Sequence, residues 1–287
     1  MNRQQAILFV NNIDNLKKTK ALLRDIIAND SQGWQRYAKK LLKYIESDFN
    51  GLAAFSIIAA KGNKKLPFYA FSSLALADCP GAGSCKSFCY SLKAWRYPAA
   101  FFRQLQNSLL LRYKPQVVKN AFYSIPKNKT LRLYVDGDFY SIENLRFWMD
   151  ACKGRKDLQV YGYSKSWRIF LQLNATGYAW PSNYLTNASS GSIYAGTGLQ
   201  NAFLKLPVVR GSFDAVKVDK RFIDSRAYQD KTRPLSKEYR ATVARILKGA
   251  GGRGFACPGN CGNCLPAGRH ACGSKQFTGV KIGIGVH

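Results

Sequence analysis

The sequence predicts an α/β protein whose parallel sheet forms a complete or partial (β/α) barrel, with a helical segment before it and a cysteine-rich loop after it. Three observations predict this class. Apolar residues recur at helical spacing over residues 13–48, a strand–helix–strand pattern occupies 130–164, and strands and helices keep alternating up to residue 248. A chain of 287 residues, 46% of them hydrophobic, can bury a large core around such a sheet.

The elements follow in chain order. After the helical segment, the apolar runs 52–60 and 66–76 are typical of strands. Residues 98–123 predict two helices that are separated near Pro115, because proline lacks the amide hydrogen that a helix interior needs.

The middle of the chain gives the clearest pattern. Residues 130–139 alternate like a strand, and 157–164 predict another. Between them, 141–152 predict a helix with Ser141 as N-cap and Glu143 in its first turn. A βαβ unit of this kind implies parallel strands joined by a right-handed crossover.

The alternation continues through a helix at 166–173, strands at 183–188 and 214–218, and a helix at 235–248. We therefore divide the chain into three parts: a helical segment (1–50), a barrel-like core (51–250) and a cysteine-rich tail packed on that core (251–287).

The chain is strongly basic, with 44 Lys and Arg against 16 Asp and Glu and a formal net charge of +28. The excess is spread along the whole length, at +13 for residues 1–150 (23 basic, 10 acidic) and +15 for the rest (21 basic, 6 acidic). A folded domain with this charge predicts an anionic partner, and nucleic acid is favoured, DNA over RNA. A basic surface without a partner is the alternative. An anionic membrane is disfavoured, because no long apolar run is present.

The first fifteen residues, MNRQQAILFVNNIDN, contain too short an apolar run for a signal peptide, so we expect a cytoplasmic protein with reduced thiols. Clustered cysteines then predict metal or cluster ligands. Seven of the eight cysteines form two groups, and the ligand set is Cys79, Cys85 and Cys89 together with Cys257, Cys261, Cys264 and Cys272. Cys152 lies on an apolar helix stripe and is expected to be buried in the core.

Two arrangements of these thiolates remain open. Three cysteines leave a coordination position free, which is typical of a reactive centre, whereas four close the shell of a structural one. A single shared site is the competing arrangement, and inert free thiols are a third. Thiolate ligands suit an iron–sulfur cluster, for which [4Fe–4S] is our first expectation, and they also suit zinc.

Histidine is nearly absent, with only His270 and His287. A serine–histidine–aspartate triad and a histidine-ligated nuclease centre are therefore disfavoured. His270 is either a further ligand of the tail or a residue that caps a loop.

The segment YVDGDFYS places two carboxylates, Asp136 and Asp138, where a parallel strand ends, which is where α/β folds place their sites. They are our candidate catalytic residues, with Gly137, Tyr140 and Ser141 as candidate cofactor contacts. The carboxylates could hold a divalent metal for phosphodiester cleavage or the amine of a cofactor. A turn with helix-capping charge is the structural alternative.

These residues also carry a resemblance. CPGAGSCKSFCY, followed by RLYVDGDFYSIENLRFWMDACK and VYGYSKSW, resembles the gene product 88 family of phage and plasmid proteins over residues 66–168. The family lends no defined activity. More distantly, the layout is similar to radical SAM enzymes, in which a three-cysteine loop holds a [4Fe–4S] cluster. The cysteines here are separated by five and three residues, whereas those of radical SAM enzymes are separated by three and two. This difference counts against binding of S-adenosylmethionine but not against an iron–sulfur cluster.

Three functions follow as hypotheses. The first is a nucleic-acid-binding protein with iron–sulfur or zinc centres that performs radical or redox modification. The second is a non-catalytic DNA-binding protein with a structural metal, and the third is a metal-dependent nuclease or nickase. The candidate nucleic-acid contacts are basic or aromatic residues: Arg96, Lys165, Trp167, Arg168, Arg253, Arg269 and Lys275.

Overall fold

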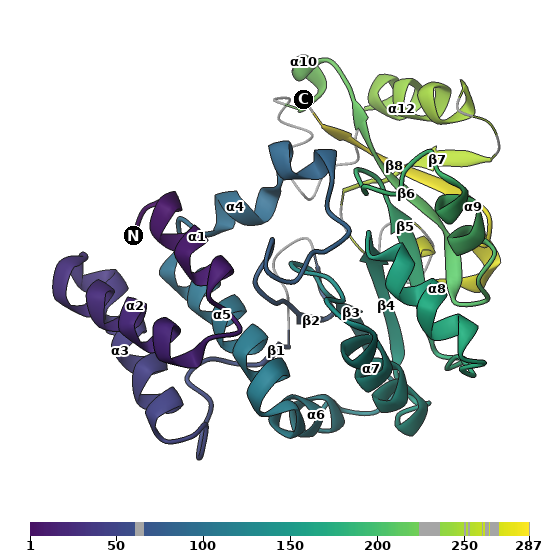
Figure 1. Cartoon of the computed structure of the whole chain (residues 1–287). Helices are drawn as coiled ribbons and strands as arrows, with labels where there is room; N and C mark the ends of the chain where they lie inside the picture. The colour runs from purple at the N-terminus through teal and green to yellow at the C-terminus, as the bar shows by residue number, and fades with distance from the viewer. Residues whose placement is uncertain are drawn as a thin grey trace.

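An N-terminal group of three helices packs beside an eight-stranded sheet in the computed structural model of the chain (Figure 1). The structure describes residues 1–60, 66–223, 236–249, 251, 253–259, 261, 264 and 270–286. The three helices are α1 (Arg3–Asn11), α2 (Leu16–Asn29) and α3 (Gln32–Glu46). The sequence predicted a helical stretch over 13–48, and the structure divides it at Asp30 and Ser31, where the backbone becomes extended.

The predicted α/β class with a mostly parallel sheet is confirmed, whereas the complete barrel is wrong, because the sheet is open. Its spatial order is β1-β2-β3-β4-β5-β6-β8-β7, and all neighbours are parallel except β1 and β2. The strands are β1 (Ile58–Ala59), β2 (Tyr69–Phe71), β3 (Thr130–Leu133), β4 (Gln159–Ser164), β5 (Tyr184–Ser189), β6 (Val209–Lys217), β7 (Gly254–Ala256) and β8 (Lys281–Val286). The short strands β1 and β7 form the two edges.

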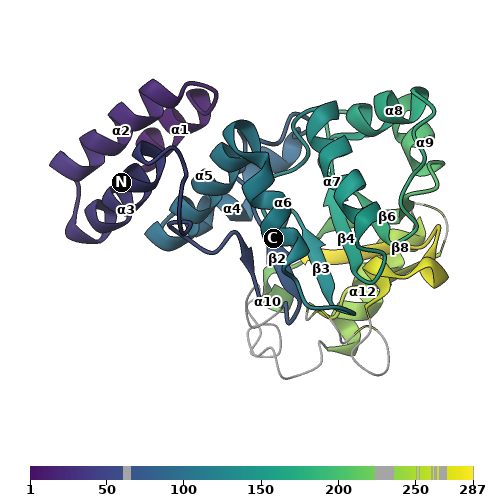
Figure 2. The same ribbon diagram turned by 90° about the horizontal axis from the view of Figure 1, so that it is seen from below.

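One face of the sheet is covered by helices, and Figure 2 shows α7, α8 and α9 together on that side. Within the described residues, the helices after α3 are α4 (Tyr90–Ala94), α5 (Pro98–Tyr113), α6 (Pro115–Tyr123), α7 (Ile142–Gly154), α8 (Trp167–Ala175), α9 (Gly198–Leu204), α10 (Lys220–Ile223) and α12 (Lys237–Gly249). The separation of α5 from α6 at Pro115 and the Ser141 cap of α7 are confirmed.

The opposite face of β4 and β5 is covered by the tail. Its short 3₁₀ helix η3 (Ala271–Gly273) lies against both strands, and η4 (Lys275–Phe277) follows. Buried Tyr161, Cys272 and Ile282 form a separate apolar cluster there. The tail also supplies β8, which pairs with both β6 and β7, so its last part is an inner strand of the sheet.

The apolar run 52–60 is a strand only at Ile58–Ala59. Before these residues, the side-chain amide of Gln106 on α5, rather than another strand, pairs with the backbone of Phe55. Gln106 Oε1 accepts from the Phe55 amide and Gln106 Nε2 donates to the Phe55 carbonyl, both at 2.8 Å. Asn107 Nδ2 donates to the Ile57 carbonyl at 2.9 Å. Side chains of a helix therefore satisfy backbone groups that a sheet neighbour would otherwise satisfy.

Candidate metal centre

The first cysteine group lies on the loop that follows β2, over the edge of the sheet where the parallel strands end. This loop is bonded to the segment after β5: the Gly83 amide donates to the Gly191 carbonyl at 2.8 Å, and the Ile193 amide donates to the Gly81 carbonyl at 3.0 Å. A β-bridge joins Ala82 to Ser192. The three-cysteine loop therefore has a fixed backbone position at the edge predicted to hold the site.

The glycines of this loop lie at positions where a side chain would not fit. A β-carbon on Gly81 would overlap the Lys165 carbonyl, and one on Gly83 would lie 2.9 Å from the Ile193 nitrogen. Across the contact, Gly191 has a φ of +79°, and a β-carbon there would lie 2.7 Å from the Cys85 β-carbon. The CPGAG motif thus allows the cysteine loop to approach the loops after β4 and β5 closely.

Two thiols of this group, those of Cys79 and Cys85, interact electrostatically with a carboxylate and a lysine. Burial raises the pKa of Cys79 well above its usual value, and Asp138 raises it further, whereas Lys165 lowers it. Burial also raises the pKa of Cys85; Lys165 opposes this shift, and Cys89 adds to it. A cation beside these thiols favours their thiolate form, which is the form that binds metal.

Asp138 is buried and its two oxygens are fully used. Oδ1 accepts from the Phe139 amide and the Ser164 hydroxyl at 2.8 Å. Oδ2 accepts from the Lys165 amide at 2.7 Å and the Ser166 amide at 3.2 Å. The carboxylate therefore joins the loop after β3 to the loop after β4, which is a positioning role and leaves no oxygen free for a metal.

Gly137 and Asp136 complete this turn. Gly137 has a φ of +80°, and a β-carbon there would overlap the Ser73 hydroxyl. Asp136 accepts a hydrogen bond from the Ser91 hydroxyl at 2.5 Å. Burial raises the pKa of Asp136, while that hydrogen bond and the charge of Arg132 act to lower it. Each member of the acidic pair thus has a cation as an electrostatic neighbour, Arg132 for Asp136 and Lys165 for Asp138.

The two candidate cofactor contacts after the acidic pair have structural partners. The Ser141 hydroxyl accepts from the Asn144 amide at 3.1 Å and caps α7. The Tyr140 hydroxyl donates to the Leu111 carbonyl at 3.3 Å, and the Arg112 guanidinium lies 4.1 Å from the centre of its ring. Both residues join α5 and α7 to the end of β3.

The second cysteine group lies against the face of the sheet opposite the helices. The Cys257 amide donates to the Gly283 carbonyl at 2.6 Å, and Asn187 Nδ2 donates to the Cys272 carbonyl at 3.0 Å. Burial raises the pKa of Cys257, and the thiols of Cys272, Cys264 and Cys261 raise it further. The pKa of Cys272 rises to about 11, mainly through burial. These four thiols are therefore electrostatic neighbours.

The ligand groups do not form a closed coordination shell. In the described part of the chain, no three His, Cys, Asp or Glu side chains are close enough to hold one metal ion as they stand. Cys152 is separate from both groups: it is fully buried on α7 within the main core, as predicted.

His270 is buried beside the tail, with 4% of its surface exposed. Its ring lies 4.2 Å from that of Tyr161 and 4.8 Å from that of Phe68, measured between centroids. Neither imidazole nitrogen has a hydrogen-bond partner among the described residues. Burial lowers the pKa of His270 to about 4, so its ring is neutral at physiological pH.

Between the two cysteine groups lies a charged residue that sequence reasoning missed. Arg132 projects from β3 with its guanidinium 4.6 Å from the centre of the Tyr163 ring. Burial acts to lower its pKa, but Tyr163, Tyr90 and Tyr161, followed by Cys261, act to raise it, and the net shift is upward. An arginine inside the otherwise apolar strand TLRLYV was the signal available in the sequence.

The predicted nucleic-acid contacts differ in how exposed they are. Arg96, Arg168, Arg253 and Lys275 are exposed. Lys165 is half-buried and donates to the Ser189 hydroxyl at 2.8 Å. The prediction for Trp167 is wrong, because this side chain is 1% exposed, stacks on Phe203 and donates to the Ser164 carbonyl. Arg269 lies outside the described residues.

Comparison with protein families identifies the class of the chain. The family model of gene product 88 matches residues 35–209, which is more than half of the length and includes the three-cysteine loop and the acidic pair. The chain therefore belongs to the gene product 88 family. No similarity to a curated protein or to a solved structure was found, so the radical SAM resemblance gains no support. No helix in the described ranges is long and apolar enough to span a bilayer.

Proposed function

We propose that this protein is a cytoplasmic nucleic-acid-binding protein that carries cysteine-ligated centres, with an iron–sulfur cluster on Cys79, Cys85 and Cys89. One observation carries the proposal. The backbone of the three-cysteine loop is fixed at the carboxyl edge of the parallel strands, and the thiols of Cys79 and Cys85 lie within electrostatic reach of Lys165. Three thiolates are the ligand set that leaves one metal position open to a second ligand.

The protein's own residues around this loop would bind and orient that second ligand. Asp136 supplies a carboxylate that is hydrogen-bonded to Ser91 and Ser72, and Arg132 supplies a positive charge beside the Tyr163 ring. A bound cluster would supply electrons for redox chemistry. The charge of Arg132 would stabilise an anionic substrate bound on the face between the cysteine groups. The Tyr163 ring would contact an aromatic part of that substrate.

The four-cysteine tail suits a structural centre. Its thiols are electrostatic neighbours, and the segment that carries them lies between β7 and β8. Zinc and iron–sulfur remain the two candidates for this group, since both accept four thiolates. In either case metal binding would order the tail, because its ligands come together only in the folded chain.

The nucleic-acid part of the proposal is supported by the net charge of +28 and by the exposed arginines and lysines of the core and tail. DNA is the first probe that we would use. A metal-dependent nuclease is less well supported, because each Asp138 oxygen already accepts two hydrogen bonds. A non-catalytic DNA-binding protein is favoured over a nuclease by the same observation.

The test is anaerobic purification followed by iron, sulfide and zinc analysis. Changing Cys79, Cys85 and Cys89 together to Ala should remove the iron and the brown colour of one cluster while the tail centre remains. Cys152→Ala is the matched control, because it removes a thiol that is buried in the core away from both groups. Wild-type protein that holds neither iron nor zinc would contradict the proposal.

A further inference from the structure

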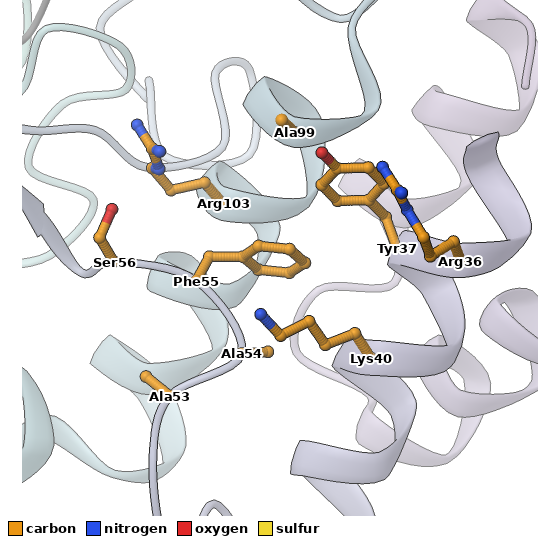
Figure 3. Close-up of a pocket in the computed structure, with 9 residues that line it drawn as sticks. All are labelled: Arg36, Tyr37, Lys40, Ala53, Ala54, Phe55, Ser56, Ala99 and Arg103. Carbon is orange, nitrogen blue, oxygen red and sulfur yellow. The ribbon is translucent and has the colours of Figure 1, made fainter.

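A cleft of about 540 Å³ lies between α3, α5 and the loop 53–56, and it shares no residue with the cysteine groups (Figure 3). Ala53, Ala54, Ser56 and Ala99 contribute small side chains that leave the space open. The large side chains of its wall are Arg36, Tyr37, Lys40, Phe55 and Arg103. The proposed function uses none of them.

The wall of the cleft is positively charged without compensation. Arg36, Lys40 and Arg103 line it, and no Asp or Glu does. In the described part of the chain, none of these three cations is paired with a carboxylate. Basic side chains nearby behave differently, since Arg24 pairs with Glu46 at 2.6 Å. The cleft therefore attracts an anion.

Arg103 adds an unused hydrogen-bond donor. Its Nε is buried and has no partner among the described residues. A buried guanidinium nitrogen normally has an acceptor, and an anionic oxygen is the acceptor that suits it best.

The same wall is aromatic. The Tyr37 and Phe55 rings are nearly parallel, at 13° with 5.6 Å between centroids. The Arg36 guanidinium carbon lies 5.2 Å from the Tyr37 centroid, and Lys40 Nζ lies 5.4 Å from that of Phe55. In Figure 3 the two rings lie between Arg36 on one side and Arg103 on the other. A ligand here would meet flat apolar surface and positive charge together.

We propose that this cleft binds a nucleotide, with its phosphate held by basic side chains of the wall and its base against the Tyr37–Phe55 wall. A planar base and an anionic phosphate are the two chemistries that this wall accepts. The ligand is either a free nucleotide or one nucleotide unit of a single strand. Only the second alternative rests on the proposed function, in which the protein binds nucleic acid.

The experiment measures binding of thymidine monophosphate, an oligothymidylate and inorganic phosphate to the full-length protein. The test variant is Arg36→Gln with Lys40→Gln, two exposed residues of α3. Its matched control is Lys17→Gln with Lys18→Gln, which removes the same two charges from exposed positions of α2. Losing charge-assisted contacts should weaken both nucleotide probes by about tenfold or more in the test variant, and by less than about twofold in the control.

Inorganic phosphate should compete at least about tenfold more weakly than thymidine monophosphate, because it cannot use the rings. Equal competition, or equal losses in the test and control variants, would overturn the inference. Oligothymidylate binding much tighter than the mononucleotide identifies a strand as the source, and similar binding identifies a free nucleotide. If the protein holds no metal but the cleft still binds nucleotide, the proposed function fails and this inference stands.

Discussion

At the scale of single residues, the acidic turn YVDGDF is held by close contacts. Asp138 accepts four hydrogen bonds from two loops, and Gly137 lies against Ser73 with no room for a side chain. Both residues thus set the position of their neighbour Asp136 at the carboxyl edge of the sheet. The two aspartates of this motif have different surroundings, and we therefore expect them to have different roles.

Gly137→Ala tests this packing. Gly137 and Gly177 both have positive φ values, +80° and +73°, but a β-carbon on Gly177 meets nothing within 4 Å. Gly177→Ala should therefore cost only the left-handed backbone strain, about 1–2 kcal/mol. Gly137→Ala should cost about 3 kcal/mol or more, because overlap with Ser73 adds to that strain. Urea unfolding measures both, and equal losses would show that the contact with Ser73 relaxes freely.

At the scale of elements, α5 has an unusual part in the fold. Its buried face carries Gln104, Gln106, Asn107 and Ser108 in addition to apolar residues. Gln106 pairs with the backbone of Phe55, and Asn107 bonds to the carbonyls of Ile57 and Ser72. This helix therefore fixes the loop that forms one wall of the nucleotide cleft as well as the chain near β2.

Gln106→Ala should destabilise the protein by about 2 kcal/mol, because it leaves a part-buried amide and a part-buried carbonyl of Phe55 without their side-chain partner. Gln116→Ala is the control, since Gln116 is exposed at the start of α6 and bonds only to the Asn120 side chain. Hydrogen exchange at the Phe55 amide should accelerate in the first variant alone. Unchanged exchange there would mean that another group replaces the Gln106 oxygen.

At the scale of the whole molecule, the most distinctive property is the net charge of +28. The charge is distributed over both halves of the chain, so no single basic arm accounts for it. A surface of this kind would contact phosphates at several places, and each contact releases a counterion.

Affinity for DNA of unrelated sequence should therefore fall steeply as salt rises. The slope of log K against log salt concentration should be about −0.9 for each phosphate contacted in duplex DNA. Fluorescence anisotropy over a range of salt concentrations gives this slope. An affinity independent of salt would contradict phosphate binding as the role of the charge.

Much of this architecture could be predicted because its signals are local. The βαβ unit from β3 to β4, the Ser141 cap and the break at Pro115 depend on residues close together in sequence. The position of β8, the saturation of Asp138 and the place of Arg132 depend on contacts between distant segments. Trp167 was misassigned for the same reason, since its partner Phe203 lies 36 residues further along.

The insertion of β8 between β6 and β7 has a consequence for how the tail is held. Among the described strands, β7 pairs with β8 alone and β8 pairs with β6, so the edge of the sheet beyond β6 is held through β8. The four tail cysteines lie in the segment that joins β7 to β8. A metal bound by these thiols would therefore link two paired strands, and its removal would loosen that edge of the sheet as well as the segment that bears the thiols.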